Sequence, residues 1–290
     1  MTERNYDSPE CWQYTIRANT LTDDLKKLGL NESGISKLRC SDFAIDIVHT
    51  DNKKVFNEVK AFIERYEWLG TMSLYPTHIF TARFHGILGG VVIMDMPITF
   101  SKMLGEDTRK IERLISRGAC ASWTPKNLAS TMISLGMKWI SKNTRFRLFV
   151  AYSDTEAKEL GTIYQACNFY YLGNTFGAGY QYKLDSGKWV SDRYFRSRSV
   201  YKRIALSEGI IWNPEWQQKD RILFAKMPTD IAAQIKNASK QMQNSCEKRS
   251  MTPKHKYAYV LGKNKAETKV LRKLFLDRNK VYPYPKERGK

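Results

Sequence analysis

Hydrophobic and polar positions follow two different periods along the chain, and these periods predict a mixture of helices and strands. Between residues 50 and 70 apolar side chains recur at helical spacing, so the pattern predicts a helix over 50–70 with Thr50 or Asp51 as its N-cap. Residues 77–84 alternate between apolar and polar side chains, as strands do, and after a turn at His85-Gly86 residues 87–95 continue as a second strand. The first part of the pattern is therefore helix, strand, strand.

The same periodicities extend this series of elements further along the chain. The expected elements are a strand over 110–118, a helix over 125–142, a strand over 145–154, a helix over 155–167 and strands over 168–173 and 178–184. A strand, a helix and a second strand imply a right-handed crossover. We therefore predict an α/β (α+β) fold in which helices flank a mixed sheet.

This order of elements resembles the GNAT acyltransferase fold. That fold has a bulged central strand, which runs into a loop and a helix that hold the pyrophosphate of acyl-coenzyme A. The pair Gly89-Gly90 lies inside the expected strand 87–95 and indicates a bulge or a close backbone approach. The resemblance implies a GNAT-like, bulged central sheet.

Composition suggests three parts of the chain. We expect residues 1–49 to form a lead-in with a short helix near 21–28, residues 50–185 to form the GNAT-like core that the resemblance implies, and residues 186–290 to form a basic extension that packs on the core and contacts DNA. With 42% hydrophobic residues, the 290-residue chain has an ordinary globular composition, which excludes wholesale disorder.

Charge is unevenly distributed along the chain. The formal net charge is +19, yet the first hundred residues hold 11 Lys and Arg against 13 Asp and Glu, whereas the last forty hold 12 against 3. A polyanionic partner such as nucleic acid or an anionic membrane explains this excess, and a basic surface that maintains solubility is the alternative.

Several classes of protein are disfavoured by the pattern. The longest apolar stretch, residues 86–96, contains Asp95 and is much shorter than the ~20 residues of a membrane-spanning helix. The N-terminal residues are polar and lack the pattern of a secretory signal. Five widely spread cysteines without a CxxC pair, and four scattered histidines, argue against a zinc knuckle and fit reduced thiols in a cytoplasm.

Small residues between the strand over 110–118 and the following helix form the first candidate site. They let backbone N–H groups approach an anion at a helix N-terminus, where an arginine adds a charge-assisted pair. An ordinary strand-to-helix turn is the alternative. The candidate donor-binding residues are Arg117, Gly118, Ala119 and Ser122.

A second candidate site lies at the carboxyl end of the strand over 145–154, where functional groups gather in α/β sheets. Asp154 ends this strand and can orient an amine or accept a proton. Tyr164 lies ten residues further on and can donate a proton to a leaving group or an oxyanion. The alternatives are a helix N-cap for Asp154 and simple packing for Tyr164.

Basic residues interleave with aromatic ones over residues 186–203. Arginines grip phosphates and aromatic rings stack on exposed bases. The alternative is a basic hairpin that packs its aromatic rings, which are Trp189, Tyr194, Phe195 and Tyr201, into a core. Together with a basic run near the C-terminal end, the candidate DNA-binding residues are Arg193, Arg196, Arg198, Lys202, Arg203, Lys254, His255 and Lys256.

Five blocks of sequence resemble the Mom family of phage DNA-modification proteins. They are ERLISRGA (112–119), AYSD (151–154), GTIYQACNFYYLG (161–173), KHKYAYVLG (254–262) and YPYPK (282–286). The resemblance implies a GNAT-like enzyme that converts adenine N6 in double-stranded DNA to a carbamoylmethyl derivative and so protects the DNA from restriction. An ordinary N-acetyltransferase of a protein or small amine, and a non-catalytic DNA-binding protein, are the alternatives.

The resemblance also implies roles for individual residues. Arg117 would anchor the phosphates of the donor, Asp154 would hold or deprotonate the adenine amine, and Tyr164 would protonate the leaving group. The donor would be acetyl-coenzyme A or a glycyl donor such as charged transfer RNA, and a metal-dependent step is left open.

This sequence departs from the family pattern at two places. Lys158-Glu159 stand where the family has Gly-His, and Tyr66 or Glu67 replaces a histidine near the end of the first long helix. His78 is an alternative to that histidine, but an ordinary strand position is the preferred interpretation for it.

Overall fold

The computed structural model divides the chain into two compact units. The first unit consists of Met1–Thr175 with Pro253–Lys290, and the second of Phe176–Thr252. This division differs from the boundaries expected from the sequence, because the last part of the chain returns to the first unit. The structure describes residues 10–48, 52–73, 75–105, 108–175, 179–218 and 221–286.

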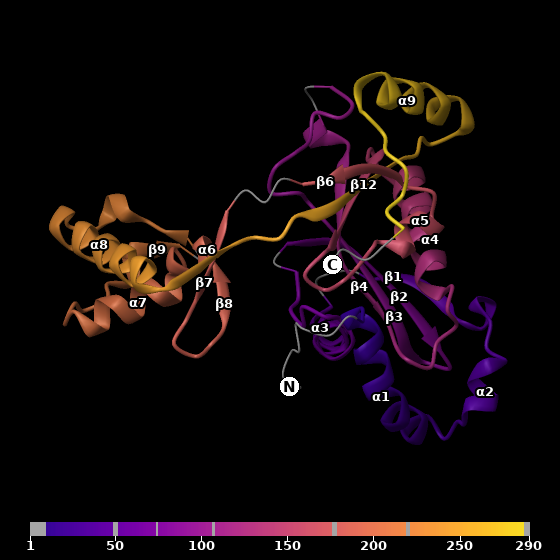
Figure 1. Ribbon diagram of the computed structural model, residues 1–290, viewed down its shortest axis with the longest axis horizontal. Helices are drawn as coiled ribbons and strands as arrows, with labels where there is room; N and C mark the ends of the chain where they lie inside the picture. Colours follow the sequence, from indigo (N-terminus) through magenta and orange to yellow (C-terminus); the bar gives the residue numbers. More distant parts are fainter. Residues whose placement is uncertain are drawn as a thin grey trace. The chain divides into compact units, whose positions relative to one another are not determined.

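Seven described strands form one sheet in the first unit (Figure 1). Their order is β1-β2-β3-β4-β5-β12-β6, with β4 and β5 parallel and the other neighbours antiparallel. The prediction of a mixed sheet flanked by helices is confirmed. The strands are β1 (Ala44–Val48), β2 (Pro76–Phe84), β3 (Ile87–Asp95), β4 (Glu112–Cys120), β5 (Leu148–Asp154), β6 (Tyr170–Asn174) and β12 (Lys254–Val260).

β12 comes from the basic C-terminal part of the chain, yet it is an interior strand. It pairs along its length with β5, from Lys254 opposite Asp154 to Val260 opposite Leu148, and on its other side with β6. Tyr257, Ala258 and Val260 are fully buried in it. This part of the tail is therefore not a separate extension, because its apolar residues complete the core.

Helices cover this sheet. The apolar positions of α3 that face the core are Val59, Phe62, Ile63 and Tyr66. Asn52 is the N-cap of α3, because its Oδ1 accepts a hydrogen bond from the Val55 N–H at 3.2 Å. The predicted caps Thr50 and Asp51 lie outside the described residues. The helices of this unit are α1 (Trp12–Leu28), α2 (Glu32–Ser36), α3 (Lys53–Tyr66), α4 (Leu128–Asn143), α5 (Thr162–Ala166) and α9 (Lys265–Arg278).

The predicted helix over 155–167 is shorter in the structure. A turn follows Asp154, whose Oδ1 accepts a hydrogen bond from the Glu156 N–H at 2.9 Å. Gly161 then has φ of 67°, in the left-handed region, so α5 begins only at Thr162. The prediction extended the helix too far because the apolar pattern continues through this turn.

β4 and β5 diverge at their carboxyl ends. They pair only from Glu112 opposite Leu148 to Ile115 opposite Ala151, whereas β4 continues beside β3 to Cys120. No described strand pairs with this edge of β4 beyond Ile115. Ala119 and Cys120, which the sequence predicts to lie between the strand over 110–118 and the following helix, therefore still belong to β4.

Both central strands carry irregularities. The register between β2 and β3 shifts at Gly89, as the glycine pair predicted, and the register between β3 and β4 shifts at Ser116. A Cβ at Gly90 would lie 2.6 Å from the Met132 sulfur of α4, so close helix packing requires glycine there.

The second unit has its own sheet and core. β11, β7 and β8 form a three-stranded sheet, and Val200, Tyr201, Ile204, Ala205 and Ile235 form a buried cluster. Its elements are β7 (Tyr180–Lys183), β8 (Trp189–Ser191), α6 (Asp192–Phe195), α7 (Arg198–Ser207), β9 (Gln217–Gln218), β10 (Arg221–Ile222), α8 (Thr229–Ser245) and β11 (Glu247–Ser250). Among the described residues of both units, no helix combines the length and the apolar character needed to cross a membrane.

Candidate functional site

Two cavities meet where β4 and β5 diverge. The donor cavity, as we call the larger one, has a volume of about 740 Å³, and the acceptor cavity has a volume of about 220 Å³. Both are formed by the first unit. The residues that line both cavities are Gln13, Ile115, Gly118, Glu159 and Tyr164.

The free edge of β4 forms one wall of the donor cavity through Gly118, Ala119 and Cys120. The first turns of α4 and the start of α5 form the opposite walls. α1 also contributes, through residues that include Arg17, so the lead-in region carries part of the site. The cationic residues of this cavity are Arg17, Lys126 and Lys158.

The acceptor cavity is polar and contains three carboxylates. Asp154 is 8% exposed, and its Oδ2 lies 2.7 Å from Lys254 Nζ. Glu67, which follows the last residue of α3, is buried and lines the same cavity. Glu159 accepts a hydrogen bond from the Asp154 N–H at 3.3 Å. An ammonium group and several carboxylates therefore share a small volume.

Burial and neighbouring charges shift the pKa values of two side chains that line both cavities, Glu159 and Tyr164. Removal from water, together with the nearby carboxylates of Glu67 and Asp154, raises the pKa of Glu159 to about 7. Burial, followed by the negative charges of Glu159 and Glu67, also raises the pKa of Tyr164. Near neutral pH the Glu159 carboxyl group can thus take up or release a proton, while the Tyr164 phenol remains a proton donor.

The predicted donor-binding residues separate in the structure. Gly118 and Ala119 line the donor cavity. Arg117 lines the acceptor cavity, where its guanidinium donates to Thr71 O at 2.8 Å and to Ser116 O at 2.6 Å. Ser122 is not among the described lining residues, because its hydroxyl donates to Asp24 Oδ2 at 2.7 Å and so anchors α1.

Gly161 brings α5 close to β12. A Cβ on this residue would lie 2.5 Å from the Tyr257 ring and 2.9 Å from Ser153 Oγ. Tyr164 packs its ring against Tyr257 and Phe169, with centroid separations of 5.5 Å in both cases. The glycine therefore lets the helix place the Tyr164 phenol at the junction of the two cavities.

Lys254, His255 and Lys256 were predicted to contact DNA, but the first two make contacts inside the first unit instead. Lys254 pairs with Asp154 inside the site. His255 is buried, with Nδ1 2.9 Å from the Tyr171 hydroxyl, and burial lowers its pKa. A buried imidazole is not presented to a phosphate backbone, so the structure does not support the predicted DNA contact of His255. Lys256 is partly exposed, and burial lowers its pKa too.

The basic segment of the second unit combines exposed cations with buried rings. Arg193, Arg196 and Arg203 are exposed, and Arg198 and Lys202 are partly exposed. Phe195 and Tyr201 are buried, so these two rings are core residues rather than surfaces for stacking on bases. The packing interpretation of the aromatic residues holds for this pair.

Of the residues that could replace the family histidine, Glu67 is the one that lies in the site. Glu67 lines the acceptor cavity, whereas the Tyr66 hydroxyl donates to Asp24 at 2.8 Å. His78 packs beside Trp139 and Phe146, and burial lowers its pKa to about 4. His78 is thus an ordinary strand residue, as expected. The described side chains include no cluster of three or more His, Cys, Asp or Glu residues suited to a metal ion.

Sequence reasoning missed Glu159 and Arg17 as site residues. In the sequence, Glu159 stands out only as a departure from the family pattern. A carboxylate where the family has a histidine is the feature that could have identified it as a site residue. Arg17 lies in a region without a recognisable motif. Its guanidinium donates to the carbonyl oxygens of Ser122 at 3.2 Å and Thr124 at 3.4 Å, contacts that only the fold creates.

Comparison with solved structures finds acetyltransferases. An acetyltransferase of Bacillus subtilis in complex with CoA is 10% identical, with 76% of this chain and 99% of that chain covered and a TM-score of 0.34. An N-acetyltransferase of Staphylococcus aureus Mu50 is 16% identical over 51% of this chain and 92% of that chain, with a TM-score of 0.35. A GNAT family acetyltransferase of Elizabethkingia anophelis with acetyl-CoA bound is 8% identical over 76% and 99%, with a TM-score of 0.32.

Comparison with curated proteins gives no match. A model of the Mom protein family, in contrast, matches residues 58–286. This range contains the five blocks of sequence, the whole acceptor cavity apart from Gln13, and both strands that diverge at the site. The chain therefore belongs to the Mom protein family.

Proposed function

We propose that this protein is a transferase that modifies the exocyclic amine of adenine in double-stranded DNA, with a carbamoylmethyl derivative as the product and protection from restriction as the purpose. The observation that carries the proposal is the shared wall of the two cavities, where Gly118, Glu159 and Tyr164 face both. A donor in one cavity and an amine in the other would meet at this wall. Membership in the Mom family supports DNA as the substrate.

The donor cavity fits an acyl-coenzyme A. Its volume of about 740 Å³ lies in the usual range for cofactor sites. The free edge of β4 beyond Ile115 offers backbone groups to the amides of an extended pantetheine chain, as an added strand would use them. Arg17, Lys126 and Lys158 supply positive charge for the donor's phosphates. Acetyl transfer from acetyl-coenzyme A would release the thiol and give an N6-acetyl amide, so the carbamoylmethyl product would then require an added nitrogen source and an oxidant. A glycyl donor such as charged transfer RNA is the alternative: its transfer forms the bond from N6 to the glycyl carbonyl carbon and releases the transfer RNA hydroxyl, and the resulting glycyl amide is an isomer of the carbamoylmethyl product, which it reaches by rearrangement alone.

Residues of the acceptor cavity have distinct roles in this proposal. Adenine N6 is a weak nucleophile, so it must be oriented and must lose a proton as it attacks. Asp154, fixed by Lys254, accepts a hydrogen bond from the amine. Glu159 takes up the proton, because its pKa near 7 suits a base at neutral pH. Tyr164 donates to the leaving group or to developing negative charge.

Double-stranded DNA must expose the target base before it can enter the acceptor cavity. Flipping a base out of the stack costs a few kcal/mol, which contacts to the DNA backbone must offset. The second unit carries 14 Lys and Arg against 7 Asp and Glu over residues 176–252. Arg193, Arg196 and Arg203 present exposed cations there, and we assign them to phosphate contacts.

Mass spectrometry of nucleosides tests the proposal directly. Plasmid DNA from cells that express the chain, together with any partner genes, should contain a carbamoylmethyl-adenine nucleoside. Asp154→Asn, Glu159→Gln and Tyr164→Phe should remove it, whereas Glu64→Gln, a change at an exposed residue of α3, should not. Unmodified adenine in all samples would contradict the proposal. Acetylation of peptide amines by the purified protein, with DNA unchanged, would favour the ordinary N-acetyltransferase.

A further inference from the structure

A third cavity lies away from the two that form the site. It is an open groove of about 1010 Å³ between the C-terminal part of α4 and one face of α9, from Lys265 to Asp277. Its positive charge comes from two residues of α4, from one residue of the loop before α9 and from four residues of α9. These cations are Lys138, Lys142, Lys263, Lys265, Lys269, Arg272 and Lys273, and Asp277 is the one acidic residue among its described lining residues.

The charge of this groove is not neutralised within the protein. All six lysines are exposed, and in the described part of the chain none of them forms a salt bridge. Lys265, Lys269 and Lys273 are spaced four residues apart on one face of α9, as are Lys138 and Lys142 on α4. Like charges at this spacing repel each other and destabilise a helix by a few tenths of a kcal/mol per pair. The fold therefore gains nothing from this arrangement.

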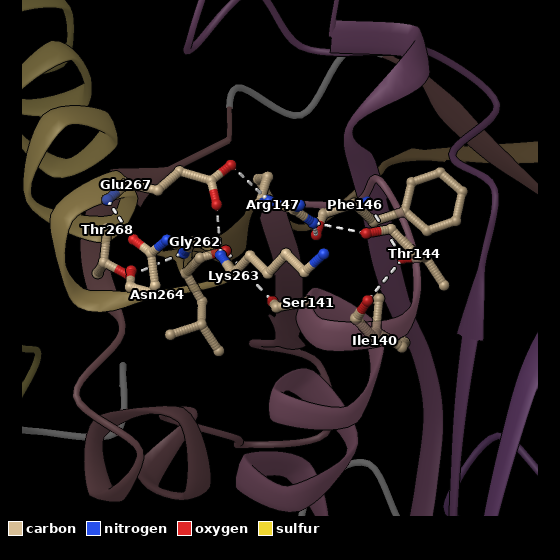
Figure 2. Close-up of polar contacts among 11 residues, drawn as sticks. Ile140, Ser141, Thr144, Phe146, Arg147, Gly262, Lys263, Asn264, Glu267 and Thr268 are labelled. Carbon is tan, nitrogen blue, oxygen red and sulfur yellow. Dashed lines mark hydrogen bonds and ion pairs between the residues drawn. The ribbon is translucent and has the colours of Figure 1, made fainter.

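The start of α9 is held firmly in place (Figure 2). Arg147 Nε lies 2.7 Å from Glu267 Oε1, and Asn264 Oδ1 accepts a hydrogen bond from the Glu267 N–H at 2.9 Å. The Ser141 hydroxyl of α4 donates to Leu261 O at 3.2 Å, which joins the two sides of the groove. Glu267 thus pairs with Arg147, and its other carboxylate oxygen accepts a hydrogen bond from the Lys263 N–H at 2.5 Å. The helix that carries these lysines is therefore held in place against α4 by these contacts.

We propose that this groove binds the sugar–phosphate backbone of double-stranded DNA that flanks the modified base. The inference rests on the proposed function, because it takes DNA as the substrate. The stripe from Lys265 to Lys273 extends ~12 Å at 1.5 Å per residue. Over that length one DNA strand presents three to four phosphates at ~3.4 Å per nucleotide. A repeated polyanion uses the whole stripe, whereas a single small anion would use one end of it.

The position of the groove relative to the reaction site supports flanking DNA. Leu261 and Gly262 follow the end of β12 where Val260 pairs with Leu148, whereas Asp154 lies at the other end of β5. Six residues of strand separate these ends, or ~20 Å at ~3.3 Å per residue. This distance corresponds to ~6 base pairs of duplex at ~3.4 Å each. One DNA molecule can therefore contact the groove while its target base enters the acceptor cavity.

Binding of a labelled duplex longer than this span, measured by fluorescence anisotropy over a salt series, tests the inference. Removing the three α9 lysines in Lys265→Gln/Lys269→Gln/Lys273→Gln should weaken binding about 10- to 100-fold and reduce the slope of log K against log salt by ~2–3. A matched control removes three exposed lysines elsewhere in the first unit, through Lys26→Gln/Lys27→Gln/Lys53→Gln. It should change the affinity less than about twofold.

A second variant, Lys138→Gln/Lys142→Gln on α4, should reduce the slope as well, and it guards against a folding defect confined to α9. Unchanged affinity and slope in both groove variants would overturn the inference, as would a loss of transfer RNA binding with duplex binding intact. If the groove variants lose duplex binding although the wild-type chain never modifies DNA, the groove stands and the proposed chemistry fails. If the wild-type chain modifies DNA and the groove variants bind it normally, the proposed chemistry stands and the groove inference fails.

Discussion

Lys254 Nζ lies 2.7 Å from Asp154 Oδ2, and the two residues face each other across the paired strands β12 and β5. The partner of the buried carboxylate thus comes from the C-terminal part of the chain. This ion pair ties the strand that completes the sheet to the candidate site.

Removal of either member of this pair should destabilise the protein more than removal of both. Lys254→Gln leaves a carboxylate that is 8% exposed without its partner, so the free energy of unfolding should fall by about 1–2 kcal/mol. The Lys254 side chain is 38% exposed, and solvent screening limits the effect. In the double variant with Asp154→Asn, urea unfolding should recover roughly 1 kcal/mol, while DNA modification stays lost. Strictly additive losses would argue against the pair.

The rate of modification should depend on the protonation of Glu159. Because the pKa of Glu159 is raised to about 7, the carboxylate that accepts a proton is present only above that pH. The rate at saturating donor and DNA should rise through pH 7 and level off above it. In Glu159→Gln the rate should be low and should lose this rise. A wild-type rate in this variant would remove Glu159 from the mechanism.

The same shift predicts a change in stability, which serves as a control for folding. A carboxyl group whose pKa is higher in the folded state stabilises the fold while it is protonated, and this stabilisation is lost as pH rises from its ordinary value to about 7. At pH 8 Glu159→Gln should therefore be more stable than the wild type by about 1–3 kcal/mol. At pH 4 the two should unfold alike. Loss of activity with this gain would separate chemistry from misfolding.

Arg17 and Arg117 should differ in their effects on the donor. Arg17 lines the donor cavity and Arg117 lines the acceptor cavity. Arg17→Gln should weaken binding of coenzyme A about 10-fold, because a charge-assisted phosphate contact is worth about 1.5–3 kcal/mol. Arg117→Gln should leave this affinity within about twofold, as measured by calorimetry. The opposite result would restore the role for Arg117 that the family resemblance implies.

Gly161→Ala should close the junction of the cavities. Its φ of 67° and the Tyr257 ring 2.5 Å from the added Cβ both oppose the substitution, so the cost should be about 2–4 kcal/mol. Gly86→Ala is a matched control, since Gly86 has φ of 83° but no atom within 4 Å of the added Cβ. It should cost about 1 kcal/mol. Equal costs in thermal unfolding would show that strain alone, without the contact, explains the effect.

Local pattern was sufficient for much of the first unit. The burial of Val59, Phe62 and Ile63 in α3 follows directly from their helical spacing. The glycine pair predicted the irregular pairing of β2 and β3. The small residues Gly118 and Ala119 predict a close approach to the backbone, and both line a cavity, although their predicted contact with a donor stays a prediction. These features depend on neighbours in sequence, which is why the sequence reveals them.

Features that depend on distant contacts could not be predicted in this way. His255 sits in a basic run, but its burial results from β12 being inserted between β5 and β6. The pKa of Glu159 depends on Glu67 and Asp154, which come from other elements. Arg117 was assigned to the donor because it lies between a strand and a helix. The continuation of β4 to Cys120 instead turns this arginine toward the acceptor cavity.

The late position of β12 in the chain also affects how the molecule is made. Synthesis proceeds from the N-terminus, so β5 is complete one hundred residues before Lys254 is added opposite Asp154. During that interval β5 and β6 lack the strand that joins them, and an unpaired edge of this kind invites aggregation. Pairing across such a sequence separation is also intrinsically slow. Until Lys254 has been synthesised, Asp154 therefore lacks its partner and the candidate site is incomplete.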